Sequence, residues 1–261
     1  MDRLAHTALN SLKMLMENQS TTAHNLANLN TPGYRQDVTA EFSSVFLDRK
    51  EGIEPRILSS RETGGFSVEQ GQMENTNNPL DIAISEAGYF IVQPQNGNIA
   101  LSRRGDLQIN DLGELTDGAG NKILDNGLQP IIIPAYTSIE FSKEGQIRVK
   151  GLGDAPDALP QNIGLIATFK PEGPINLKKS LDGKIRIQEI DGEGNIVEGE
   201  IVPNQQAKII QGFLEKSNVN AIEEMVNSLD YQRKFEIHIK MIQLADEMDQ
   251  AGSSLMRLPN F

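Results

Sequence analysis

The sequence contains no cysteine, which excludes a thiol nucleophile, a disulfide framework and a cysteine-ligated zinc site. It also has no apolar run that approaches the roughly 20 residues needed to cross a bilayer, so we expect no membrane insertion. The first residues, Met1 to His6, fit the start of an amphipathic helix better than a cleavable secretion signal. Ordinary secretory export is therefore not expected.

Basic residues are scarce: 24 lysines and arginines stand against 36 acidic residues, and the formal net charge is −12. The basic residues form no cluster that could contact successive phosphates. Nucleic acid and anionic membrane surfaces are therefore poor candidates as partners.

Residues arranged for catalysis are also scarce. The three histidines, His6, His24 and His238, lie near the chain ends, and none has a second histidine at the spacing of helix ligands. The sequence has no phosphate-binding glycine loop, no His-Glu-x-x-His segment and no nucleophile elbow. We expect no cofactor, no metal, no small-molecule substrate and no enzyme activity, although the many carboxylates could include a hydrolase pair.

Both ends of the chain carry apolar residues at alternating steps of three and four, the spacing of a seam between helices. Charged residues lie between the apolar positions of the C-terminal stretch 220–258, so this helix needs a partner on one side. Gln19 interrupts the N-terminal pattern, and that helix should stop at Asn30-Thr31-Pro32-Gly33. The predicted seam consists of Ala5, Leu9, Leu12, Met16, Ala23, Leu26, Ile237, Met241, Leu244, Met248, Ala251, Leu255 and Leu258.

Neither end should be stable alone. Burial of seven apolar side chains contributes on the order of 10–20 kcal/mol, whereas ordering about twenty residues costs about 1–2 kcal/mol each. The C-terminal helix should therefore be stable only when other helices cover its stripe. Ser217, Asn218 or Asn220 could cap its start.

The middle of the chain changes to short strands separated by turn residues. Asn96-Gly97 is typical of a two-residue hairpin, and stretches 146–150 and 184–188 alternate, so each should bury one face and expose the other. Asp117 to Asn121 is echoed by Asp191 to Asn195, and we interpret both as turns rather than calcium loops. We predict an α+β fold with a mostly antiparallel β domain inserted between terminal helices that form a coiled-coil-like assembly domain. The N-terminal helix should occupy 1–34 and an extended connector 35–78. The β domain should occupy 79–203, and the C-terminal connector and long helix 204–261.

Two short motifs lie beside the predicted helices. Their positions are Ala27, Asn28, Thr31, Pro32, Gly33, Tyr34, Ser217, Asn218 and Val219. The sequence around these motifs resembles the bacterial flagellar rod and hook family, and so do 78–84, 88–92 and 103–107 in the middle. The stretch 123–202 matches only in general terms, and the tail 257–261 departs from the usual ending.

The resemblance implies a structural subunit of the flagellar basal body, in the rod that crosses the periplasm. Its partners would be copies of itself, other rod proteins and the flagellar type III export apparatus, and it would transmit torque and join rod segments. A proximal rod subunit is favoured, and a distal rod subunit of similar length is the alternative. Two further alternatives are a peptidoglycan hydrolase and a cell-wall adaptor that recruits one.

Overall fold

The computed structural model describes residues 2–38, 43–46, 57–60, 65–95, 97–153, 155, 157–173, 175–180, 182–190, 192 and 195–256. The chain divides into two compact units. Unit 1 combines Met1–Ala27, Asp37–Gly65 and Asn220–Phe261, and unit 2 combines Asn28–Gln36 and Phe66–Val219.

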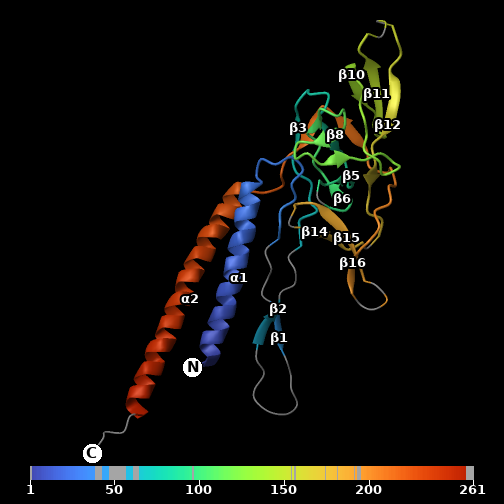
Figure 1. Ribbon diagram of the computed structural model, residues 1–261. Helices are drawn as coiled ribbons and strands as arrows, with labels where there is room; N and C mark the ends of the chain where they lie inside the picture. The colour runs from blue at the N-terminus through green and yellow to red at the C-terminus, as the bar shows by residue number, and fades with distance from the viewer. Residues whose placement is uncertain are drawn as a thin grey trace, which may run out of the picture. The chain divides into compact units, whose positions relative to one another are not determined.

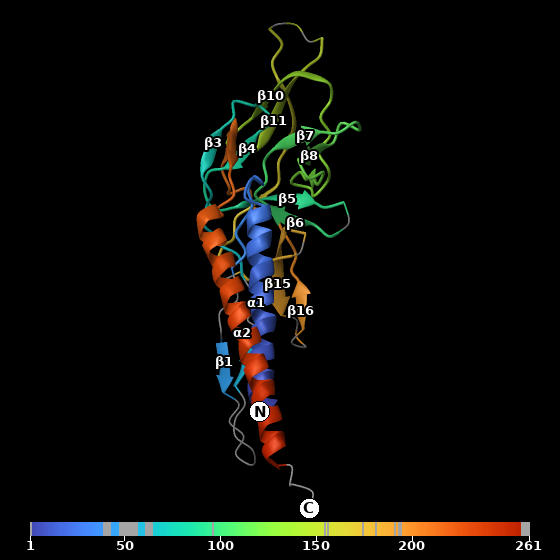
Figure 2. The ribbon, with the colours of Figure 1, turned by 90° about the vertical axis from the view of Figure 1, so that its left-hand side faces the viewer.

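Unit 1 is built on two long helices, α1 (Asp2–Ala27) and α2 (Ala221–Met256), which lie side by side and run in opposite directions (Figures 1 and 2). An antiparallel hairpin of β1 (Ser43–Phe46) and β2 (Ile57–Ser60) completes the unit. The amides of Ile222 and Glu223 donate to Asn220 Oδ1, at 3.1 and 3.5 Å. Asn220 is therefore the cap among the three predicted candidates. Within the described residues, no helix is both long and apolar enough to span a membrane.

Buried and half-buried positions of the paired helices recur every seven residues, and polar side chains lie among apolar ones such as Leu12, Phe235 and Ile242. On α1, Ala8, Leu15 and Thr22 form one buried series and Asn18 and Asn25 another. On α2, Glu224 and Ala245 are buried, and Tyr231 and His238 between them are half-buried. We call these nine positions the helix-pair seam.

Unit 2 is a set of antiparallel sheets. The largest has nine strands in the order β14-β15-β6-β5-β9-β8-β7, with β13 beside β5 and β16 beside β15; smaller sheets are β10-β11-β12, β17-β4 and β18-β3. Every pairing between described strands is antiparallel. The strands are β3 (Met73–Asn75), β4 (Ile82–Ile84), β5 (Tyr89–Gln93), β6 (Ala100–Ser102), β7 (Leu107–Ile109), β8 (Leu115–Asp117), β9 (Lys122–Ile123), β10 (Tyr136–Phe141), β11 (Gln146–Gly151), β12 (Gln161–Leu165), β13 (Thr168–Phe169), β14 (Leu177–Lys179), β15 (Ile185–Ile190), β16 (Ile196–Glu198), β17 (Ile209–Gln211) and β18 (Phe213–Glu215).

The core of unit 2 lies on both faces of its main sheet. Alternate residues of β5 enter different clusters: Phe90 and Val92 enter one, and Tyr89 and Ile91 enter the other. The strands β5 and β6 pair as the predicted hairpin, although Asn96 of its turn lies outside the described residues. The fold is α+β, with an antiparallel β unit and two helices from the chain ends, as the sequence predicts.

The two alternating stretches behave differently. In β11, Ile147 and Val149 are buried and Arg148 is exposed, which confirms the predicted alternation. The same prediction for 184–188 is wrong, because Lys184 and Arg186 are also buried. Ion pairs compensate their burial: Lys184 Nζ lies 3.2 Å from Asp117 Oδ2, and Arg186 Nη2 lies 2.7 Å from Asp182 Oδ2.

The loop from Asp117 to Asn121 is organised as a turn. The amides of Ala119 and Asn121 both donate to Asp117 Oδ1 at 2.9 Å. With Lys184 beside Oδ2, this carboxylate is held by turn contacts and one ion pair. The second copy of the sequence, around Asp191, lies partly outside the described residues.

Candidate assembly surface and terminal junction

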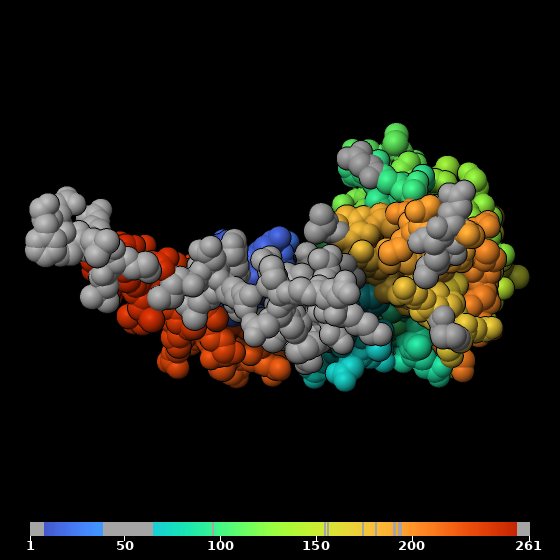
Figure 3. Space-filling model, turned by 90° about the horizontal axis from the view of Figure 1, so that it is seen from below, coloured from blue at the N-terminus to red at the C-terminus, as the bar shows by residue number. Residues whose placement is uncertain are grey.

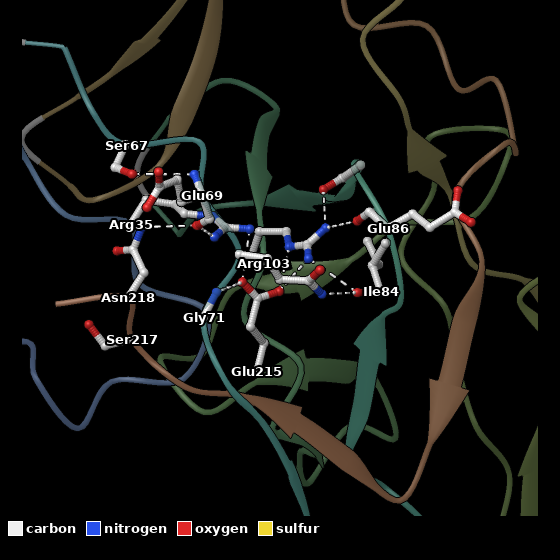
Figure 4. Close-up of polar contacts among 12 residues, drawn as sticks. Arg35, Ser67, Glu69, Gly71, Ile84, Glu86, Arg103, Glu215, Ser217 and Asn218 are labelled. Carbon is white, nitrogen blue, oxygen red and sulfur yellow. Dashed lines mark hydrogen bonds and ion pairs between the residues drawn. The ribbon is translucent and has the colours of Figure 1, made fainter.

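The two motif segments meet in unit 2. The Gly33 amide donates to the Glu215 carbonyl at 2.7 Å, and the Asn218 amide donates to the Tyr34 carbonyl at 3.3 Å. The Asn218 side chain accepts from the Gln36 amide at 2.6 Å and donates to the Glu69 carbonyl at 2.9 Å. The chain leaving α1 and the chain entering α2 are thus joined; we call this cluster the terminal junction (Figure 4).

Three buried charges form the centre of the terminal junction. Glu215 lies between two arginines: Arg35 Nη2 is 2.8 Å from its Oε1, and Arg103 Nε donates to its Oε2 at 2.7 Å. Arg103 Nη2 also donates to that carboxylate. All three side chains are at most 4% exposed. Both cations therefore depend on the same buried anion.

Backbone carbonyls accept further guanidinium hydrogens, although the buried Nε of Arg35 has no hydrogen-bond partner among the described residues. Arg103 Nη1 donates to the carbonyls of Glu86 and Gly88, at 2.6 and 2.8 Å, and Nη2 donates to that of Ile84 at 3.1 Å (Figure 4). Arg35 Nη1 donates to the Glu69 carbonyl. The planar fork of arginine suits this pattern, because one group can satisfy several acceptors at fixed angles.

Burial shifts the titration of two groups at the terminal junction. It lowers the pKa of Arg103 from its ordinary value, and the neighbouring Glu215 opposes that shift. It raises the pKa of Tyr89, where the charges of Arg35 and Arg103 act in the opposite direction. Arginine ionises so far above neutral pH that Arg103 keeps its charge. The terminal junction is therefore held by charge-assisted hydrogen bonds.

The glycines of this cluster are required by close backbone approach. Gly33 has φ +66°, and a Cβ there would lie 2.3 Å from the carbonyl carbon of Arg103. A Cβ on Gly71 would lie 1.9 Å from the Lys216 carbonyl oxygen. Gly71 also donates its amide to Glu215 Oε1 at 3.0 Å. Larger residues would separate the segments that the buried charges connect.

The rest of the N-terminal motif forms a turn. The Thr31 amide donates to the Asn28 carbonyl, and the Thr31 hydroxyl contacts Asn28 Oδ1, both at 3.1 Å. Lys179 of β14 donates to the Arg35 carbonyl at 2.7 Å and lies 3.6 Å from the centre of the Tyr34 ring. In the C-terminal motif, the Val219 amide donates to Ser217 Oγ at 3.3 Å. The motif residues are thus turn and junction residues.

In unit 1, Asn25 links both helices to the chain that follows α1. Its Nδ2 donates to Glu224 Oε1 at 2.6 Å and to the Asp37 carbonyl at 2.9 Å. Its Oδ1 accepts from the Asp37 amide at 2.9 Å. Asn25 is fully buried and Glu224 nearly so, so this contact fixes the register of α1 against α2.

We expect Asn25→Ala to destabilise the helix pair by about 2 kcal/mol, because buried groups on Asp37 and Glu224 lose a partner. Amide exchange along α1 and the first turns of α2 should accelerate by more than tenfold. Ser20→Ala, at an exposed position of α1, serves as the control and should leave exchange unchanged. Equal exchange in both variants would show that Asn25 does not fix the register.

The surface of α2 away from α1 is unusually apolar. Among residues 221–254, whose side chains the structure describes, nine large apolar residues are exposed. Eight of them lie on one side of the helix, at the spacing of successive helical turns apart from the adjacent pair Met225 and Val226, and form the outer face of α2: Ile222, Met225, Val226, Leu229, Ile237, Met241, Leu244 and Met248. Figure 3 shows one side on which orange-to-red atoms of α2 reach the surface.

The predicted seam lies one residue away from the helix-pair seam on both helices. Leu9, Met16 and Ala23 are exposed next to the buried Ala8, Leu15 and Thr22. On α2, Ile237 and Leu244 are 56% and 57% exposed, next to His238 and Ala245. Of the other predicted positions, Met241, Met248 and Ala251 are exposed, whereas Leu12 is buried and Leu26 is half-buried. The side chains of Ala5 and Leu255 are not described, and Leu258 lies outside the described residues.

Sequence reasoning missed the residues that hold these contacts. Arg35 directly follows the N-terminal motif, Glu215 stands two residues before Ser217, and Arg103 opens the stretch 103–107 that resembles the family. These places are the signal that could have identified them, whereas Asn25 carries no comparable signal. The described residues contain no group of three or more potential metal ligands.

Comparisons with known proteins agree with these features. Family models match three stretches: "Flagella basal body rod protein" at 6–35, "Flagellar hook protein FlgE/F/G D1 domain" at 83–149 and "Flagellar basal body rod FlgEFG protein C-terminal" at 210–255. The flagellar basal-body rod protein FlgF of Salmonella typhimurium is 30% identical over 99% of this chain and 100% of its own length. FlgF of Escherichia coli is 30% identical over 97% and 96%, and FlgG of Borreliella burgdorferi is 31% identical over 98% and 100%.

Paired terminal helices, an antiparallel β unit and motif segments joined at a buried junction define a structural protein of the flagellar rod and hook class. The full-length similarity narrows this class: the chain belongs to the family of flagellar basal-body rod proteins. It is a structural subunit of the rod in the flagellar basal body, and it assembles with other rod components. The resemblance seen in the sequence is confirmed.

Proposed function

We propose that this chain is a subunit of the proximal rod, which polymerises through its terminal helices, transmits torque and joins rod segments. In this proposal α1 and α2 form a coiled-coil-like assembly domain, and the β domain at 79–203 lies outside it. The observation that carries the proposal is the outer face of α2, with eight large apolar residues exposed in the single chain.

The apolar area explains why contacts with neighbours would be favourable. Soluble monomers rarely expose contiguous apolar patches of this kind, and such patches mark interaction sites. Burial of each large apolar side chain contributes about 1.5–3 kcal/mol. A contact between different faces of successive copies does not close on itself, so it would extend into a helical polymer.

The exposed flank of α1 supports the same proposal. Leu9 and Met16 are 62% and 59% exposed and lie seven residues apart, with Ala23 after them at the same spacing. The exposed positions of the predicted seam would thus be open on both helices for copies of the chain or for other rod proteins. A proximal position is supported by full-length similarity to two FlgF proteins, whereas FlgG relatives of comparable identity keep a distal position as the alternative.

Passage through the flagellar type III export apparatus also belongs to this proposal. Helices that pair weakly before assembly suit a chain that travels unfolded. The proposed role needs no enzyme activity, cofactor or small-molecule substrate. A zymogram with the purified chain tests the peptidoglycan-hydrolase alternative, and a pull-down with the full chain tests the cell-wall adaptor.

We expect both arms of the dilute monomer, 5–26 and 237–258, to exchange their amide hydrogens rapidly, because their apolar stripes lack cover. Slow exchange should be confined to unit 2. Hydrogen exchange followed by mass spectrometry measures this pattern, with assembled rods as the comparison. Strong protection of both arms in the monomer would contradict polymerisation through these helices. An image of the isolated basal body with this subunit located would decide between the proximal and distal positions.

A further inference from the structure

The exposed sulfur of this chain lies on its two long helices. Because the sequence has no cysteine, its eight methionines carry all of the sulfur. Of the six whose side chains the structure describes, Met14 is buried and Met73 is half-buried. The other four are between 39% and 59% exposed, and we call them the exposed methionines: Met16, Met225, Met241 and Met248.

The exposed methionines occupy the surfaces that the proposed function assigns to assembly. Three of them belong to the outer face of α2 and make up three of its eight large apolar side chains. Met16 belongs to the exposed flank of α1, seven residues after Leu9. Methionine is the one apolar residue of these surfaces whose side chain a mild oxidant makes polar. The apolar character of both surfaces therefore depends in part on the oxidation state of sulfur.

The chemistry is the transfer of one oxygen atom from a peroxide to a thioether. The sulfur lone pair attacks one oxygen of hydrogen peroxide, an S–O bond forms, and the O–O bond breaks. The proton of the transferred hydroxyl passes to the departing hydroxide, which leaves as water. Sulfur loses two electrons and the peroxide gains them, so the reaction needs no other reactant. The product is methionine sulfoxide, which reductases return to methionine.

The effect of the new oxygen depends on what surrounds it. In the single chain, the sulfoxide of an exposed methionine stays in water, so its polar oxygen is hydrated. In a contact with an apolar neighbour, the same oxygen would lose water without gaining a hydrogen-bond donor, and that loss is unfavourable. Oxidation of these side chains should therefore act on assembly more than on the fold of the single chain.

We propose that the exposed methionines are a redox modification site, at which a peroxide blocks the addition of the subunit to the rod. Oxidation before assembly makes the apolar surfaces polar, and reduction restores them. Once neighbours cover these surfaces, the same sulfur atoms are shielded from the oxidant. This inference rests on the proposed function, because it requires that the exposed methionines lie on assembly surfaces.

The first test measures the reaction of each methionine with hydrogen peroxide by peptide mass spectrometry, in the purified full-length chain and in isolated basal bodies. Free methionine added to each sample reports the peroxide dose. In the free chain, the exposed methionines should react within about threefold of the rate of free methionine, because susceptibility follows exposure. In basal bodies they should react at least about tenfold more slowly. Slow reaction in the free chain, or equal rates in the two preparations, would overturn the proposal.

The second test imitates the two oxidation states without an oxidant. One chain carries Met16→Gln, Met225→Gln, Met241→Gln and Met248→Gln, which place a polar group where the sulfoxide would be. The matched chain carries leucine at the same four positions and keeps the surfaces apolar. With each chain as the sole copy in cells, the glutamine chain should enter basal bodies at least about tenfold less than the leucine chain. Equal incorporation of the two chains would overturn the proposal.

The last test adds hydrogen peroxide to cells while the subunit is being made, and compares each strain with its own untreated culture. Incorporation of the wild-type chain should fall by about threefold or more, whereas incorporation of the leucine chain should not respond. A wild-type response no larger than that of the leucine chain would overturn the proposal. Leu244→Asp separates the two levels. If it assembles, the proposed function fails; if it is excluded while the glutamine chain assembles, only this inference fails.

Discussion

We expect Leu244→Asp to abolish incorporation of the subunit into rods, so that cells carrying it as the sole copy lose motility. Leu244 is 57% exposed on the outer face of α2, so the monomer tolerates the new carboxylate in water. Burying that charge against an apolar neighbour costs several kcal/mol, and the cost recurs at every subunit of a polymer. The expected reduction in rod assembly is therefore more than a hundredfold.

Motility in soft agar and the subunit content of isolated basal bodies measure this effect. Gln243→Asp adds the same charge one residue earlier, on a flank of α2 where Asp246 and Gln250 also lie, and should assemble normally. The thermal transition of unit 2 should be unchanged in both variants. Normal motility of the Leu244→Asp strain would remove the outer face of α2 from the assembly mechanism.

The sequence was sufficient to predict the helices, the antiparallel sheets and the family. Periodicity also located apolar stripes on both arms, but the contact inside the subunit lies one residue away, at Ala8, Leu15 and Thr22 and at Glu224, His238 and Ala245. Hydrophobicity selects the stripe with the largest apolar side chains. The helix-pair seam has many small and polar side chains, such as Ala8, Thr22 and Asn25, so hydrophobic periodicity does not reveal it.

The terminal junction could not be predicted for a different reason. Arg35, Arg103 and Glu215 belong to segments that are far apart in the sequence, and an ion pair between distant segments leaves no periodicity in either. The buried Lys184 and Arg186 show the same limit, because their partners Asp117 and Asp182 decide their burial. Alternation predicts which side a residue faces, whereas its burial depends on what covers that side.

We expect Glu215→Ala to destabilise unit 2 by about 3–5 kcal/mol, the range found when one partner of a buried ion pair is removed. Arg35 and Arg103 would then be buried without the carboxylate that both contact. For a unit of this size the melting temperature should fall by about 10 °C. Differential scanning calorimetry of the full chain measures the change.

The control for Glu215→Ala is Glu74→Ala on the adjacent strand β3. Glu74 Oε2 lies 3.1 Å from Lys216 Nζ, but both side chains are about half exposed, and ion pairs of this kind contribute little. Glu74→Ala should therefore melt like the wild type, and the same result for Glu215→Ala would show that the buried charges do not hold the terminal junction. Glu215→Ala should loosen the segment that leaves α1 and the segment that enters α2. Rod assembly should therefore be reduced even though the outer face of α2 is intact. Leu244→Asp, by contrast, should stop assembly while unit 2 remains folded. The two variants therefore distinguish loss of the terminal junction from loss of the outer face of α2.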